Sequence, residues 1–316
     1  MDLDFKLDVA PNVLMALAGV FTILLLASVI VAVLKARNPQ KDYNELVLRV
    51  RSWWVMASIF SLAMIITRDL TLIFLGLVSF LALKEYLSII PTRRADRRVL
   101  FWAYIAIPIQ YYWIHEQWYG MFIIFVPVYL FLFIPFRMIL IGETKNFLHA
   151  VGTIHWGVMT MVFSISHVAY LLALPDNKNP AAGGAGLVLF LIFLTQFNDV
   201  AQYTWGKMLG KHKIVPKVSP NKTWQGFLGG VITTTILAVL LAPVLTPMDL
   251  KLAITAGLII SIGGFIGDVT VSAVKRDIGV KDSGSMLPGH GGILDRIDSL
   301  TYTAPLFFHF IYYFYY

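Results

Sequence analysis

The chain has 316 residues, of which 58% are hydrophobic and 14% charged, and its formal net charge is +7 at pH 7. That charged fraction lies well below the roughly 25% of soluble proteins, and the mean hydropathy is +0.74, which together exclude an ordinary soluble domain. The absence of cysteine excludes disulfides, thiolate nucleophiles and cysteine zinc sites. The net positive charge would suit nucleic acid, but in a membrane protein basic loops first serve orientation, so we expect no nucleic acid partner.

Apolar segments recur along the whole chain and predict the fold class. A bilayer core of about 30 Å needs roughly 20 apolar residues per helix. The first segment is too long for a signal peptide and has no small-residue cleavage site, so we interpret it as a retained anchor. We predict an all-α polytopic membrane protein of about ten transmembrane helices. The predicted spans are residues 13–34, 53–67, 70–90, 99–115, 119–141, 151–174, 186–206, 226–247, 251–271 and 300–316.

The chain shows no tandem repeat and no second soluble domain. We expect residues 1–150 to form N-terminal transmembrane helices and residues 151–316 to form a C-terminal transmembrane catalytic region, the two making one integral unit. The only low-complexity stretch, DNKNPAAGGAG at 176–186, is typical of a flexible connection.

Basic residues gather between alternate spans. If the first span enters from outside, five polar loops fall on the same side: residues 35–51, 92–98, 143–149, 206–223 and 281–299. Only four of the 25 Lys and Arg residues then lie on the opposite side: Lys6, Arg68, Lys178 and Lys251. Because basic loops remain cytoplasmic, we predict an integral plasma (inner) membrane protein with both termini outside and these loops, with the active site, facing the cytoplasm.

The first polar cluster lies in FLTQFNDVAQYTWG. An aspartate near a membrane span is costly and suggests function. Asp199, Gln202 and Tyr203 share one helix face, with Gln196 and Asn198 close by. The alternative is a helix that simply ends in polar residues before a basic loop.

The second cluster is VSPNKTWQGFLGG. Ser219 and Pro220 indicate a turn with Asn221 and Lys222, which leads into a helix whose N-cap is Thr223. A lysine beside the free amides of a helix N-terminus suits a phosphate. The alternatives are a topology role for Lys222 and close helix packing for the glycines at 226, 229 and 230.

The third cluster is GDVTVSAVKRD. On a helix, Asp268, Ser272 and Lys275 line one face, with Arg276 beside them. A carboxylate and a hydroxyl can hold a hydrated cation, and the two basic groups can hold a phosphate. The alternative is solvation of the helix end at the membrane boundary.

The fourth cluster is KDSGSMLPGHGGILDRIDS, residues 281–299. Its glycines, including Gly291 and Gly292, let main-chain amides approach a ligand. Asp295 and Asp298 are neighbours on a helix and suit a hard cation such as Mg²⁺. His290 could bind phosphate or transfer a proton, or it could only stabilise a turn. The chain contains neither a P-loop motif nor a GxSxG elbow, which disfavours those reaction classes.

These residues resemble a known family. SAVKRDIGVKDSGSMLPGHGGILDRIDS, residues 272–299, is similar to the signature of the phosphatidate cytidylyltransferases, also called CDP-diacylglycerol synthases. It matches S-x-x-K-R, then K-D, then P-x-H-G-G-x-x-D-R-x-D. The stretch KVSPNKTWQGFLGG resembles the family's S-P-x-K-T-x-E/Q-G-x-x-G-G. The resemblance covers roughly residues 198–300 and is only architectural before them.

The resemblance implies a reaction in which CTP and phosphatidate give CDP-diacylglycerol and pyrophosphate, with membrane lipids as surroundings. It implies Mg²⁺ as cofactor, leaves a second cation and a homodimer open, and assigns His290 to pyrophosphate departure. The implied catalytic residues are Asp268, Lys275, His290, Asp295 and Asp298. The implied metal ligands are Asp199, Asp268, Asp282, Asp295 and Asp298, with Ser272 completing the shell. The implied substrate-binding residues are Asn221, Lys222, Thr223, Ser272, Arg276, Lys281, Gly291, Gly292 and Arg296, joined on the phosphates by Lys275.

Two departures bear on the acceptor. Val200, Ala201 and Gln202 stand where a D-x-x-A-Y pattern is expected, and Thr153 with residues 155–160 matches nothing familiar. A paralogue that activates another lipid phosphate with CTP therefore stays open. A transporter is disfavoured because no repeat appears and the carboxylates gather toward helix ends. A CTP-dependent lipid kinase would release CDP rather than pyrophosphate.

Overall fold

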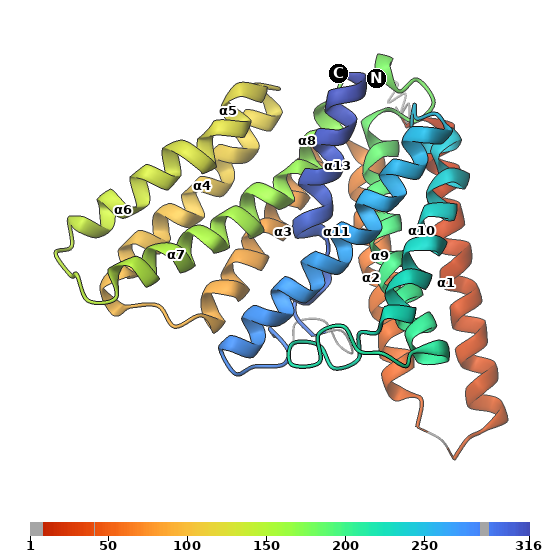
Figure 1. The fold of residues 1–316 in the computed structure, drawn as a ribbon. Coiled ribbons are helices and arrows are strands. Elements are labelled where there is room, and N and C mark those ends of the chain that lie inside the picture. Colours follow the sequence, from red (N-terminus) through yellow and green to blue (C-terminus); the bar gives the residue numbers. More distant parts are fainter. Residues whose placement is uncertain (1–8, 41, 285–290) are drawn as a thin grey trace, which may run out of the picture.

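The computed structural model describes residues 9–40, 42–284 and 291–316, and these form an almost entirely helical molecule (Figure 1). Within these ranges no strand forms, and an isolated bridge between Lys213 and Thr223 is the sole β-type pairing. The all-α fold predicted from the apolar segments is therefore confirmed.

Eight described helical segments are long and apolar enough to cross a membrane. Six are single helices: α1 (Pro11–Arg37), α2 (Asn44–Ile66), α3 (Arg68–Ile89), α9 (Gly183–Leu209), α10 (Trp224–Leu245) and α11 (Leu250–Asp277). Two are broken by a π-helical turn, which divides α5 (Tyr119–Ile124) from α6 (Phe131–Ile139) and α7 (Phe147–Val158) from α8 (Ile165–Ala173).

The predicted count of ten spans is not confirmed. The segments at 99–115 and 300–316 do form helices, α4 (Arg97–His115) and α13 (Leu300–Tyr315), but neither is among the eight. The 16 residues of α13 rise about 24 Å, which is short of a bilayer core. Helix α2 begins at Asn44 rather than near residue 53. Its first turns are polar, and for that reason the sequence pattern predicted a loop there.

The second half of the chain packs around close contacts of α9, α10 and α11. A Cβ on Gly226 of α10 would lie 2.7 Å from the carbonyl oxygen of Gln202 on α9, and Gly230 approaches the same residue. Asn198 of α9 donates to the Ser261 carbonyl of α11 (3.1 Å) and accepts from Thr234 of α10 (3.2 Å). Close helix packing, given above as the alternative role of these glycines, is therefore what the structure shows for Gly226 and Gly230.

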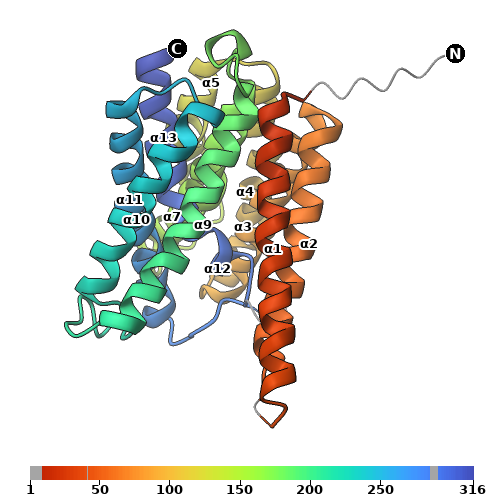
Figure 2. The ribbon, with the colours of Figure 1, turned by 90° about the vertical axis from the view of Figure 1, so that its right-hand side faces the viewer.

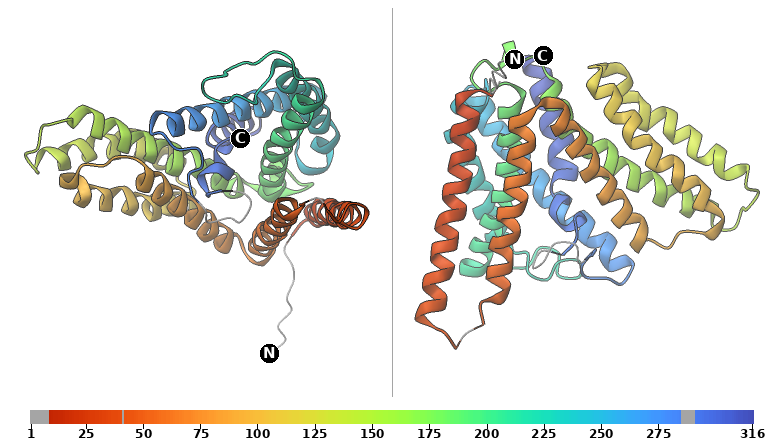
Figure 3. Two further views of the ribbon diagram at one scale, coloured as in Figure 1. Left: turned by 90° about the horizontal axis from the view of Figure 1, so that it is seen from below. Right: turned by 180° about the vertical axis from the view of Figure 1, so that it is seen from behind.

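The helix ends are sorted between the two faces of the molecule. The start of α1 and the end of α13 lie at one end, whereas the α1–α2 turn and the α9–α10 connection lie at the other (Figure 1). The hairpin of α1 and α2 stands beside α9 (Figure 2). Seen from below, the short helix α12 (Leu294–Ile297) lies toward the centre, against α3 (Figure 3). This arrangement agrees with the alternation of basic loops; which face is cytoplasmic stays a prediction.

The absence of cysteine allows a direct test of orientation. Lys178 and Lys217 are both exposed and lie in connections on opposite sides of the expected topology. We expect a membrane-impermeant maleimide to label the Lys178→Cys variant in intact cells and the Lys217→Cys variant only after permeabilisation. The reverse labelling would invert the predicted orientation, and labelling of both in intact cells would contradict the alternation.

Candidate active site

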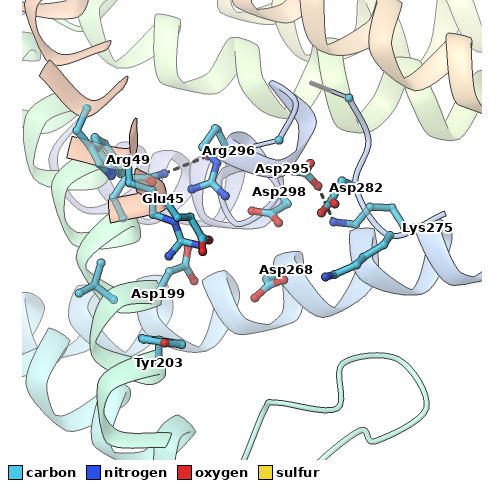
Figure 4. Close-up of a pocket in the computed structure, with 16 residues that line it drawn as sticks. Glu45, Arg49, Asp199, Tyr203, Asp268, Lys275, Asp282, Asp295, Arg296 and Asp298 are labelled. Atoms are coloured by element: carbon cyan, nitrogen blue, oxygen red, sulfur yellow. Dashed lines mark hydrogen bonds and ion pairs between the residues drawn. The ribbon is translucent and has the colours of Figure 1, made fainter. Parts of the chain in front are cut away.

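A cavity of about 940 Å³ opens between α2, α9, α11 and the loops around α12 (Figure 4). Its lining is unusually rich in ionisable groups, with six carboxylates and four basic side chains. Nine of the predicted site residues line it: Asp199, Asp268, Lys275, Lys281, Asp282, Gly291, Asp295, Arg296 and Asp298. The fold thus brings together residues that lie up to 99 positions apart in the chain, from Asp199 to Asp298.

The first charge pair joins the α9–α10 connection to α11. The Lys222 ammonium lies 2.5 Å from Asp268 Oδ2 and also donates to Gln202 Oε1 at 3.2 Å. Burial disfavours the charged form of Lys222, but the carboxylates of Asp268 and Asp199 outweigh burial and raise the Lys222 pKa. Ser272, one turn along α11, donates to Asp268 Oδ1 (3.3 Å), as the predicted helix face requires.

The second charge pair joins α11 to the loop before α12. Lys275 Nζ lies 2.6 Å from Asp295 Oδ1, and the other carboxylate oxygen accepts the amides of Ser283 and Gly292, both at 3.1 Å. Burial alone would raise the Asp295 pKa, yet the bond from Lys275 and the two amides hold it below its usual value. Asp295 is therefore locked in place as an anion.

Two further carboxylates of the cavity, Asp298 and Asp199, are hydrogen-bonded to Ser299 rather than to a lysine. Asp298 accepts the Ser299 amide (2.7 Å), and the Ser299 hydroxyl donates to Asp199 (3.1 Å). Burial and then the charges of Asp268 and Asp199 raise the Asp298 pKa well above its usual value. Carboxylates thus crowd the side of the cavity next to α9 and oppose one another's ionisation, and a bound cation would relieve that repulsion.

The carboxylates of the cavity fit one of the two ways in which a protein can bind Mg²⁺. Among the described residues no three Asp, Glu or His side chains converge closely enough to enclose an ion by themselves. Mg²⁺, however, usually retains several waters and binds through one or two carboxylates together with substrate phosphates. Asp298, with Asp199 or Asp268 beside it, fits that mode, whereas a cage built from protein atoms alone does not form. The assignment of Mg²⁺ stays a proposal.

Other predicted residues lie beside the cavity rather than in its lining. Thr223 caps α10 by accepting the Gly226 amide (3.2 Å), as predicted, and Asn221 is exposed. Arg276, an expected phosphate contact, instead donates to the backbone carbonyls of Val218 and Val280, both at 3.2 Å, so this geometry favours a structural role.

The sequence before α12 contains four of the predicted site residues: Lys281, Asp282, His290 and Gly291. Asp282 and Lys281 are exposed at the cavity rim. Gly291 has φ +78°, a left-handed conformation that favours glycine. His290 lies outside the described residues, so its predicted role stays a prediction.

The comparison with protein families decides the class of enzyme. The model of the cytidylyltransferase family matches residues 47–314, which is most of the chain. The chain belongs to the cytidylyltransferase family. It is therefore a nucleotidyltransferase, and the enzyme class inferred from the signature at 272–299 is confirmed.

Two groups of relatives illustrate the range of the family. Uncharacterized protein YnbB of Escherichia coli (strain K12) is 48% identical over 298 residues, which cover 94% of this chain and 98% of that protein. Phosphatidate cytidylyltransferases of Staphylococcus haemolyticus (strain JCSC1435) and Staphylococcus aureus (strain COL) are 39% identical over 150 residues. Those alignments span 47% of this chain and 58% of each staphylococcal enzyme, so the acceptor lipid is a matter for proposal.

In this cytidylyltransferase the first half of the chain supplies residues that sequence reasoning missed. Glu85 of α3 is buried and accepts the Ser283 hydroxyl and the amides of Ile293 (2.9 Å) and Leu294 (3.1 Å). It thereby fixes both ends of the stretch that carries the signature glycines. A carboxylate inside an apolar span is a functional signal, and the segment LALKEYLSI contained it.

Three residues on α2 were missed for a different reason. Glu45, Arg49 and Trp53 recur at every fourth position and all line the cavity. The sequence had placed the first two in a loop, so their shared helix face was not recognised.

The contact of Glu85 with Gly292 yields a coupled prediction. A Cβ at Gly292 would overlap the Glu85 carboxylate, so Gly292→Ala should be strongly destabilising while Glu85 is present. Glu85→Ala leaves two amides and a hydroxyl unpaired and should cost about 1–3 kcal/mol of stability, together with most of the turnover. In the double variant the overlap is gone, so the two losses should be much less than additive.

Thermal unfolding in detergent and pyrophosphate release measure the two quantities. The matched control is Asp69→Asn, which removes a carboxylate from the exposed start of the same helix. Strict additivity of the Glu85 and Gly292 variants would contradict the contact.

Proposed function

We propose that this membrane cytidylyltransferase converts CTP and phosphatidate into CDP-diacylglycerol and pyrophosphate at the cytoplasmic face of the plasma membrane. The observation that carries the proposal is the cavity whose lining carboxylates Asp268 and Asp295 pair with Lys222 and Lys275. Lys222, Lys275 and Asp295 lie in the two segments that resemble the family motifs, and Asp268 lies one turn before the second of them. The cavity lies between membrane helices, where a lipid and a soluble nucleotide can meet.

The proposed step needs no nucleophilic side chain. A phosphate oxygen of phosphatidate attacks the α-phosphorus of CTP, the new P–O–P bond forms, and the bond between the α- and β-phosphates breaks to release pyrophosphate. The attacking oxygen is already anionic near neutral pH. Catalysis then depends on position and on neutralisation of phosphate charge, which the ammonium groups of Lys222, Lys275 and Lys281 and the Arg296 guanidinium supply.

Magnesium supplies charge neutralisation on the departing pyrophosphate when bound. Asp298, with Asp199 or Asp268, would hold one or two cations, and Ser272 donates a hydrogen bond to Asp268. Asp295, bonded to Lys275 and two amides, serves mainly to position that lysine. His290 is proposed to assist the departure of pyrophosphate.

A related lipid phosphate is the second candidate acceptor. Two departures from the family pattern support it. Val200 lines the large cavity. Thr153 and Trp156, from the other unusual stretch, line a smaller cavity of about 620 Å³ beside the end of α11. The accumulation of carboxylates at the cavity rather than in the middle of the bundle argues against a transporter.

The first test is product analysis with purified protein, CTP and Mg²⁺. We expect pyrophosphate release that depends on phosphatidate and forms CDP-diacylglycerol. Pyrophosphate release only with another lipid phosphate would move the proposal to that acceptor. Release of CDP instead would make the protein a lipid kinase and contradict the proposed reaction.

Neutralising Asp298 tests the metal assignment. Asp298→Asn keeps the shape of the side chain but removes a proposed metal ligand. We expect turnover to fall about a hundredfold or more, and the Mg²⁺ concentration needed for half-maximal activity to rise. Asp249→Asn, at the exposed start of α11 and outside both cavity linings, is the matched control, because asparagine also caps helices. Unchanged Mg²⁺ dependence in the Asp298 variant would remove that residue from the metal site.

A further inference from the structure

The basic groups of the cavity divide into two sets on opposite sides of the carboxylates. Lys275 lies beside Asp295 and Asp282 near the loops, whereas Arg49 and Arg296 lie on the side of Asp199 (Figure 4). The enzyme handles two phosphate-bearing substrates, so two separate cationic sets suggest two separate phosphate subsites.

The Arg49 side chain is positioned by α2. Glu45, Arg49 and Trp53 occupy one face of that helix and point toward the cavity lining. Arg49 forms an ion pair with Glu45, and the two side chains are 47% and 72% exposed. An exposed pair of this kind is weak, so Arg49 can exchange the Glu45 carboxylate for a phosphate.

Arg296 comes from α12 and faces the same space. Gln196 of α9 donates to the Arg296 carbonyl (3.1 Å) and so holds its backbone against α9. The Nε of Arg296 is buried and, among the described residues, meets no hydrogen-bond acceptor. A buried guanidinium donor that lacks an acceptor is costly, and a phosphate oxygen would satisfy it.

The surroundings of these two arginines belong to the membrane. Trp53, Val200 and Tyr203 line the same side of the cavity, and the last two are 55% and 64% exposed on α9. Both α2 and α9 are candidate spans, so this side adjoins lipid, whereas residues 281–284 and 291 belong to a polar loop. A tryptophan and a tyrosine at this level are typical of the membrane interface.

Resting on the proposed function, we propose that Arg49 and Arg296 form the subsite for the phosphomonoester of a membrane-embedded lipid acceptor. The acyl chains leave between α2 and α9, past Trp53 and Tyr203, and the phosphate is held next to Asp199. Guanidinium groups suit this task because their planar forks bind phosphate through paired hydrogen bonds. The triphosphate of the nucleotide occupies the opposite side of the cavity, beside Lys275.

Steady-state kinetics in mixed micelles separate the two subsites. Arg49→Gln should raise the KM for phosphatidate about tenfold or more while the KM for CTP stays within about twofold. Arg49→Lys keeps the charge without the fork and should recover part of the loss. Arg51→Gln is the matched control, because Arg51 is exposed on the same helix and does not line the cavity. A rise in the KM for CTP alone would overturn the assignment.

The Glu45→Gln variant separates loss of the ion pair from loss of the arginine. It breaks the same pair but keeps the Arg49 guanidinium at the cavity, so acceptor affinity should be kept or increased. An equal loss of acceptor affinity in the Glu45 and Arg49 variants would show that the pair merely shapes α2, and would overturn the proposal.

A binding measurement keeps this proposal distinct from the proposed reaction. Purified protein without CTP, titrated with dioleoyl phosphatidate in nanodiscs, should bind it more tightly than dioleoyl phosphatidylcholine, and Arg49→Gln should abolish the difference. Arg49-dependent binding without turnover would leave the subsite standing while the reaction fails. Equal binding of the two lipids, or equal competition by soluble glycerol 3-phosphate, would overturn a lipid phosphomonoester subsite.

Discussion

Charge balance within one cavity is the constraint on which the rest of the structure depends. Six carboxylates line it, and two of them are compensated by lysines from distant segments, through Lys222–Asp268 and Lys275–Asp295. Each pair connects two elements, so the attraction that offsets desolvation also fixes the α9–α10 connection and the α12 loop against α11. Asp298 and Asp199 are hydrogen-bonded to Ser299 rather than to a lysine, and they are the carboxylates proposed to meet a cation.

Ser283 and the start of α12 are held from the other half of the chain as well. Glu85 reaches it from α3 across as many as 209 positions of sequence and accepts three donors there. The N-terminal helices are thus more than a membrane anchor, because α3 shapes the loop and α2 forms a wall of the cavity. One cluster of buried apolar side chains, from Val13 to Ile311, includes residues of both halves.

The two proposed subsites would divide the work of recognition. The proposed nucleotide side carries Lys275 and the exposed Lys281 near water, where a strongly charged triphosphate can enter. The other side is built from arginines and aromatic residues on membrane helices. A difference in acceptor between relatives would therefore arise on α2 and α9, while the lysine side and α12 could stay the same.

The sequence alone determined the fold class, the approximate positions of the helices and most of the polar site. Apolar runs, a Thr223 cap and the spacing of Asp268, Ser272 and Lys275 are local properties, since a helix repeats every 3.6 residues wherever it lies. Only the tertiary structure decided that Arg276 binds backbone carbonyls, that Glu85 accepts hydrogen bonds from Ser283 and the start of α12, and that Arg49 lines the cavity. Those outcomes depend on contacts between segments far apart in the chain. Lys275 and Arg276 are neighbours in sequence, and local periodicity cannot predict which of them bonds to the carboxylate of Asp295 and which to backbone carbonyls.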